Sequence, residues 1–269
     1  MWNKFSRLAF GGLMTLTLIP PAIAAVSPKA KDLNPYVLQA IQNMPAAGGY
    51  STAHEAGEAL VRAVVSRPEL SVDAQNATPS FCTSATYLVF LNALELAAAQ
   101  GEFSLGNQAT AVYDKLLPPS DITSLFKDDG KGLWGRWNAN GPGTGRFFYE
   151  TGIGGNFTSA ATRKPGDFLK IWWTEAVGAK ERGHSVVYLG ARKNPTTGDP
   201  ELQYWSSNQG TGYNKVWVSE SKVIHAIYSR LTAPQNLTRA LSIPETGTYL
   251  RDCLTVESSF AEAKQKSGI

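Results

Sequence analysis

One stretch of this sequence decides the fold: Asn76-Ala-Thr-Pro-Ser-Phe-Cys82-Thr-Ser-Ala-Thr-Tyr-Leu-Val-Phe-Leu91, in which a cysteine opens a long apolar run. Pro79 and Ser80 are typical of a helix start, and apolar residues then recur at helical spacing until Gly101. The pattern predicts a buried helix with Cys82 in its first turn. A thiol is a nucleophile only as the thiolate, and a helix N-terminus favours that form.

A candidate base for this thiol lies far downstream, in Gly183-His184-Ser-Val-Val-Tyr-Leu-Gly190. The β-branched and aromatic residues predict a strand at 185–189, so a rigid sheet would present the imidazole of His184. The other two histidines fit structural roles better. His54 has the spacing of a capping box at the start of an amphipathic helix, and His225 alternates with apolar residues on a sheet surface or in a core.

A third group is needed to orient the imidazole. The next predicted strand, 202–206, is followed closely by Asn208, whose side chain would accept the ring N–H and hold one tautomer. Three neighbours within one or two positions remain alternatives for this role: Ser206, Ser207 and Gln209.

In this order of cysteine, histidine and asparagine the chain resembles the papain-like cysteine hydrolase superfamily, and within it the NlpC/P60 and CHAP branch that cuts bacterial cell-wall peptides. Pro165-Gly-Asp167 is similar to the segment that leads into the first core strand of such domains. The Gly183–Gly190 stretch is similar to their catalytic histidine strand, and Asn208-Gln-Gly-Thr-Gly-Tyr213 to the turn after the orienting asparagine. The resemblance covers about residues 74–218.

The resemblance implies an exported thiol hydrolase that cleaves an amide through an acyl-cysteine, with peptide or peptidoglycan stem peptides as substrate. It also implies a papain-like α+β fold in which the nucleophile helix packs on an antiparallel sheet, with extra N-terminal helices. Asn76 stands six residues before Cys82, where papain-like enzymes carry the glutamine that completes the oxyanion hole with the backbone N–H of the cysteine. We expect no cofactor and no metal.

The N-terminus predicts a signal peptide over residues 1–24. Lys4 and Arg7 precede an apolar stretch at 8–19, and Ala22-Ile-Ala24 is a small-residue cleavage site. The apolar stretch is too short for a bilayer span, so we expect an exported, periplasmic or secreted, protein with no membrane span. Loss of two basic residues with this peptide lowers the formal charge from +3 to +1, which argues against a nucleic-acid partner.

The order of the predicted elements indicates an α+β fold. Helices come first, and strands at 168–173, 185–189, 202–206 and 215–219 follow with hairpin-like links. We expect an N-terminal helical arm at 25–73, a catalytic domain at 74–232 and a C-terminal extension at 233–269 that ends in an amphipathic helix at 256–266.

Residues 128–156 are rich in both glycine and aromatic side chains. Trp134 and Trp137 would form a wall of the substrate cleft, or else an ordered loop would turn them onto the core. Trp205 and Tyr213 are further candidates for substrate binding. Asp128-Asp129 begins like a calcium loop, but no glutamate follows at the spacing that would complete it.

Alternatives to hydrolysis remain open at this stage. Cys82 could be an inert buried thiol or form a disulfide with Cys253, for which a packing role is expected. An acyl-cysteine could pass to an amine instead of water, which gives an acyltransferase. A non-catalytic cell-envelope binding protein would use its tryptophans as contact surface: Trp134, Trp137, Trp172, Trp173 and Trp205. The oligomeric state is not predicted.

Overall fold

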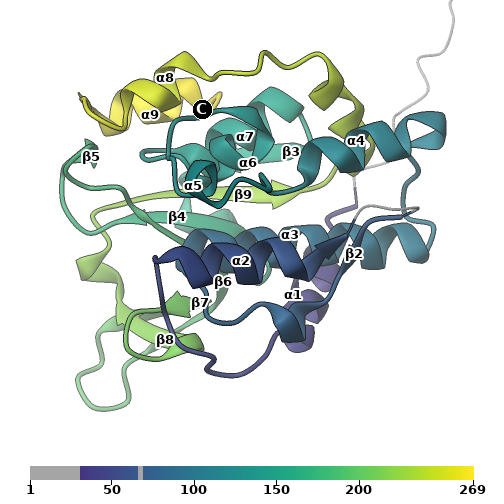
Figure 1. Ribbon diagram of the computed structural model, residues 1–269. Helices are drawn as coiled ribbons and strands as arrows, with labels where there is room; N and C mark the ends of the chain where they lie inside the picture. Colours follow the sequence, from purple (N-terminus) through teal and green to yellow (C-terminus); the bar gives the residue numbers. More distant parts are fainter. Residues whose placement is uncertain (1–30, 66–68) are drawn as a thin grey trace, which may run out of the picture. The chain divides into compact units, whose positions relative to one another are not determined.

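A six-stranded antiparallel sheet carries the candidate site in the computed structural model, which describes residues 31–65 and 69–269 (Figure 1). The predicted signal peptide, 1–24, lies outside these residues. The strand order is β3-β9-β4-β6-β7-β8. The strands are β3 (Gly154–Phe157), β4 (Phe168–Trp172), β6 (His184–Lys193), β7 (Pro200–Asn208), β8 (Gly212–Ser219) and β9 (His225–Leu231). The α+β class is confirmed, and β3 and β9 join the four strands expected from the sequence.

The helix that begins at the cysteine, α3 (Cys82–Ala99), packs on this sheet as predicted. Its start is held by Ser84, whose hydroxyl accepts the Phe81 N–H at 3.2 Å, and Gly101 follows its end with φ +71°. Among the described helices α3 alone has the length and hydropathy of a membrane span, yet 72% of it is buried inside the structure. Its apolar character is that of a core helix.

Alternation along the strands separates the two faces of the sheet. Phe168, Val187 and Trp205 join α3 in one apolar cluster, whereas their neighbours Leu169 and Val186 belong to a second cluster. This period of two is the signature of a sheet with distinct faces. By the same alternation Lys170 lies on the face of Phe168, toward α3, whereas His184 and Asn208 have the parity of the second cluster.

The remaining helices surround α3 and the sheet, and Lys31–Ile269 form one compact unit. Residues from both the predicted arm and the predicted extension, such as Leu60 and Leu237, belong to the same apolar cluster as α3. The helices are α1 (Asn34–Asn43), α2 (His54–Ala63), α4 (Ala109–Leu116), α5 (Ile122–Leu125), α6 (Gly132–Asn138), α7 (Gly143–Thr151), α8 (Thr248–Asp252) and α9 (Phe260–Lys266).

Short elements complete the chain. Two two-stranded ladders pair β1 (Val64–Val65) with β2 (Ser71–Val72) and β5 (Val177–Gly178) with β10 (Glu257–Ser258). Because Glu257 and Ser258 are in a strand and Ser259 caps the helix, α9 begins at Phe260, later than the predicted 256. Single turns of 3-10 helix occupy Ala74–Asn76, Gly106–Gln108, Ala160–Thr162 and Glu220–Lys222, and a longer one Pro234–Leu241.

The tryptophans of the glycine-rich stretch lie in the core, so their predicted place in a substrate cleft is wrong. Trp137 is 0% exposed and stacks on Phe90 of α3, with ring centroids 4.9 Å apart. Trp134 is 2% exposed, and its Nε1 donates to the Leu125 carbonyl at 2.8 Å. The stretch forms α6 and α7, and burial of the two large indole rings in the core stabilises the fold more than exposure to solvent would.

Trp205 and Tyr213 are also buried, so the prediction that they bind substrate is wrong as well. Their rings stack in parallel on adjacent strands at 5.5 Å between centroids. The Tyr213 hydroxyl donates to the carbonyl of Ala77, which ties β8 to the segment that leads into α3. Both residues therefore support the position of Cys82 rather than contact a ligand.

Candidate active site

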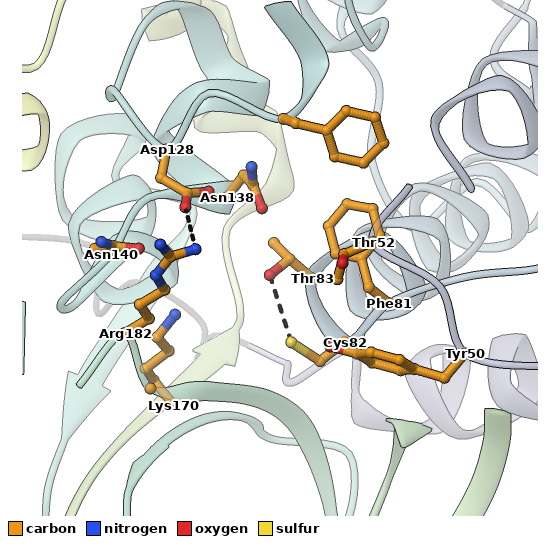
Figure 2. A pocket seen from close by; sticks show the side chains of 12 residues that line it. Tyr50, Thr52, Phe81, Cys82, Thr83, Asp128, Asn138, Asn140, Lys170 and Arg182 are labelled. Carbon is orange, nitrogen blue, oxygen red and sulfur yellow. Dashed lines mark hydrogen bonds and ion pairs between the residues drawn. The ribbon is translucent and has the colours of Figure 1, made fainter. Parts of the chain in front are cut away.

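Cys82 lines a cavity of about 310 Å³ at the N-terminus of α3 (Figure 2). The thiol is half-buried, and its Sγ lies 3.7 Å from the Thr83 hydroxyl. As the first residue of the helix, Cys82 has a backbone N–H with no acceptor inside the helix. The cavity is lined by Tyr50, Thr52, Phe81, Cys82, Thr83, Phe126, Asp128, Asn138, Asn140, Lys170, Arg182 and Gly183.

His184 and Asn208 come together because β6 and β7 are antiparallel neighbours, with Val187 opposite Trp205. The start of β6 and the end of β7 therefore meet at one edge of the sheet. His184 Nε2 lies 3.2 Å from Asn208 Oδ1. The pairing expected from the sequence is thus present in the structure.

The bonds of Asn208 determine which nitrogen of His184 is the base. Asn208 Nδ2 donates to the carbonyls of Ser206 and Asn214 at 3.0 and 3.3 Å, so its Oδ1 must accept from the ring. His184 Nε2 therefore carries the proton, and in the neutral ring the lone pair is on Nδ1. This tautomer leaves Nδ1 free to take a proton from the thiol.

Aromatic neighbours hold the imidazole in place. Tyr204 meets the His184 ring edge-on at 5.5 Å between centroids, and Trp173 lies at 6.4 Å. Gly183, immediately before His184, has φ +77°, and a Cβ there would stand 2.7 Å from Lys170 Cε. The positive φ is the feature that favours glycine at this position of the Gly-His motif.

None of the three alternatives to Asn208 has a hydrogen bond to His184. The Ser206 hydroxyl donates to the Ser185 carbonyl at 2.8 Å, and the Ser207 hydroxyl donates to the Ser80 carbonyl at 2.9 Å. Both hydroxyls are buried and tie β7 to the strand and segment beside it. Gln209 is exposed in the turn after β7.

The electrostatics of the site favour the thiolate. Burial alone would raise the pKa of the Cys82 thiol, but the hydrogen bond with His184, the positive charges of His184 and Lys170 and the backbone N–H of Ser185 lower it to about 6. A pKa near 6 places most of the thiol in the ionised form at neutral pH.

The second cysteine is unrelated to this chemistry. Both cysteines are free, so the disulfide between Cys82 and Cys253 is not formed. Cys253 is buried, and burial raises the pKa of its thiol. The two other histidines have partners elsewhere: His54 pairs with Glu58, and His225 pairs with Glu175.

Asn76 does not belong to the cavity, so its predicted role in an oxyanion hole does not fit the structure. It ends a turn of 3-10 helix, is exposed, and donates its amide to Asp73 at 2.6 Å. The six-residue spacing to Cys82 is preserved, but that turn and the bond to Asp73 direct the side chain elsewhere.

Comparisons of this chain with profiles of known protein families, with curated protein sequences and with solved structures found no significant match.

Two lining residues, Tyr50 and Lys170, were not found from the sequence. Tyr50 lies about thirty positions before Cys82 in a segment without a motif, and burial followed by the charge of Cys82 raises the pKa of its phenol. The position of Lys170 in the sequence could have indicated a functional role. It shares the inward face of β4 with Phe168 and Trp172, and a lysine at such a position is unusual.

Proposed function

We propose that this protein is a thiol hydrolase that cleaves an amide bond through an acyl-cysteine intermediate, with Cys82 as nucleophile, His184 as base and Asn208 as the residue that orients the ring. The observation that carries the proposal is the arrangement of Cys82, His184 and Asn208, called the trio below. A helix-terminal thiol with a pKa lowered to about 6 lies beside an imidazole whose tautomer is fixed by Asn208. This is the logic of a nucleophile, a base and an orienting group, on a papain-like order of residues.

The proposed reaction has two halves. The Cys82 thiolate attacks the carbonyl carbon, the C–N bond breaks, and the proton held on His184 Nδ1 passes to the leaving amine. The neutral imidazole then takes a proton from water, the hydroxide attacks the thioester, and the C–S bond breaks to release the acid. His184 Nε2 keeps its proton throughout, because Asn208 accepts that hydrogen bond at every stage.

An oxyanion must be stabilised in both halves. The backbone N–H of Cys82 is one donor, and we assign the second to the hydroxyl of Tyr50 in place of Asn76. Tyr50 lines the cavity with Cys82, and no hydrogen bond to another described residue occupies its hydroxyl. Since the raised pKa keeps the phenol protonated, Tyr50→Phe should lower kcat by about 10²-fold, the typical loss of one oxyanion donor, with little change in KM.

Peptidoglycan stem peptides are the first substrate class to test, because the order of the trio resembles the branch that cuts them and the N-terminus has the pattern of an export signal. The experiment is incubation of purified muropeptides with wild type and Cys82→Ser, with products read by mass spectrometry. Wild type should release amine and acid fragments, and Cys82→Ser should release none. Cys253→Ser is the matched control and should behave as wild type. Equal turnover by Cys82→Ser would refute the proposal.

The same spectra test the acyltransferase. Added primary amine would appear in the products as a new amide if the acyl-cysteine transfers to it. A binding protein without catalysis has less support, because four of the five tryptophans proposed as its contact surface are buried: Trp134, Trp137, Trp172 and Trp205.

A further inference from the structure

Two buried cations in this chain have very different surroundings. Arg136 is 1% exposed and fully bonded, with Glu150 as its ion-pair partner and four backbone carbonyls as further acceptors. Lys170 is 3% exposed, and its only hydrogen bond within the described residues is a long one, 3.5 Å, to the Ala139 carbonyl. No described carboxylate lies within ion-pair distance of Lys170. A buried ammonium without a partner is costly, so a structural role does not explain it.

Lys170 is part of the cavity wall that faces Cys82. Figure 2 shows Lys170, Arg182, Asn140 and Asp128 together on the side opposite Cys82 and Tyr50. Arg182 is 70% exposed and touches Asp128 only at 3.7 Å. Burial raises the pKa of Asp128 to about 6, so this carboxyl is still mostly ionised at neutral pH. Among the lining residues two cations face one carboxylate, which leaves this wall with a net positive charge.

Burial lowers the pKa of the Lys170 ammonium, and the charge of the Cys82 thiolate is the largest contribution that opposes this in the free protein. That compensation ends when the thiolate is acylated, because a thioester sulfur carries no charge. The ammonium would then be buried with no counter-ion through the second half of the reaction. An anionic group brought by the substrate would remove this cost.

From the unpaired Lys170 and the positive wall beside it, we infer that this wall is a subsite for a free carboxylate of the substrate, held next to the scissile amide by Lys170 and Arg182. The inference rests on the proposed function for the identity of the bond that is cut. It adds the substrate class: amides that carry a free carboxylate beside the reacting carbonyl, on either the acyl or the amine side.

Charged and neutral alkylating agents test the subsite without any turnover. Iodoacetate and iodoacetamide attack the same thiolate, so a change in the pKa of Cys82 cancels in the ratio of their rates. We expect the rate with iodoacetate divided by the rate with iodoacetamide to be higher for Cys82 of wild type than for free glutathione. In Lys170→Met this ratio should fall about tenfold, because a nearby positive charge is lost from a poorly solvated site. Arg182→Gln, at an exposed position, should lower it less. Lys193→Met, at the exposed end of β6, is the control and should leave it unchanged.

Paired substrates test the inference in catalysis. Peptides are compared as the free acid and as the carboxamide, once with the group on the acyl side and once on the amine side. Wild type should favour one free acid by kcat/KM, and Lys170→Met should remove that preference while it acts less on the carboxamide. An unchanged reagent ratio together with equal slowing of acid and carboxamide in Lys170→Met would overturn the subsite and leave Lys170 as a positioning residue for the thiolate. A reagent ratio that depends on Lys170 in a protein that cleaves no amide would uphold the subsite and refute the hydrolase.

Discussion

Replacement of His184 by alanine should slow the alkylation of Cys82 most strongly near pH 6. With a pKa of about 6 about half of the Cys82 thiols are ionised at that pH, whereas a thiol with the ordinary value of 9.0 is ionised about once in a thousand. The gain in thiolate is about 500-fold. A thiolate of lower pKa is also a weaker nucleophile, and a Brønsted slope of 0.4–0.5 over three pKa units removes a factor of about 20. The expected difference is about 25-fold.

The assay is iodoacetamide labelling of the folded protein, with Cys82 and Cys253 followed separately by peptide mass spectrometry. The rate at Cys82 should rise with pH through about 6 and then level off in wild type. In His184→Ala it should keep rising beyond pH 8, because burial then dominates the pKa of the thiol. His54→Ala is the matched control at an exposed histidine. Equal rates at Cys82 in wild type and His184→Ala at pH 6 would refute the assignment of His184 as the partner of the thiol.

Three further changes test other parts of the structure. Asn208→Ala should lower kcat about tenfold, which corresponds to the loss of one hydrogen bond to the imidazole. A kcat equal to that of wild type across the pH–rate profile would contradict this role of Asn208. Trp137→Ala should cost about 3–5 kcal/mol in urea unfolding, as expected for a large core side chain, while the folded fraction keeps its Cys82 labelling rate. Asp128 binds its proton more tightly in the folded state, with a pKa raised from 3.8 to about 6, so stability should fall as pH rises from about 4 to 6. Asp128→Asn should remove that slope and stabilise the fold at pH 7 by up to about 3 kcal/mol in thermal melts.

The sequence predicted most of the secondary structure around the site because those segments have strong periodicity. The apolar run after Cys82 and the β-branched strand after His184 each have one dominant pattern, and the structure forms both. The strand β3 was missed because Gly154-Gly155 lacks side chains that show alternation, and its pairing with β9 is determined by contacts distant in sequence.

The functional interpretation of aromatic residues could not be made from composition. Glycine beside tryptophan is consistent with an open cleft or with close helix packing, and only the three-dimensional structure shows that Gly143 approaches the Arg136 carbonyl so closely that a Cβ would stand at 2.7 Å. That contact brings α6 and α7 together and directs Trp137 inward. The predicted oxyanion role of Asn76 was wrong for a related reason: a spacing in sequence does not determine the direction of a side chain on a single helical turn.

The three residues of the proposed catalytic trio lie at rigid points of the fold. Cys82, His184 and Asn208 occupy the end of a buried helix and the ends of two paired strands, where backbone bonds leave little freedom. The cavity wall opposite Cys82 is the less satisfied part, because Lys170 has no ion-pair partner among the described residues and burial raises the pKa of Asp128. Groups whose pKa values are shifted by burial and by one another concentrate at functional sites. The energetic cost of this protein's site is therefore concentrated in the wall that would meet the substrate, which is where a substrate charge can remove it.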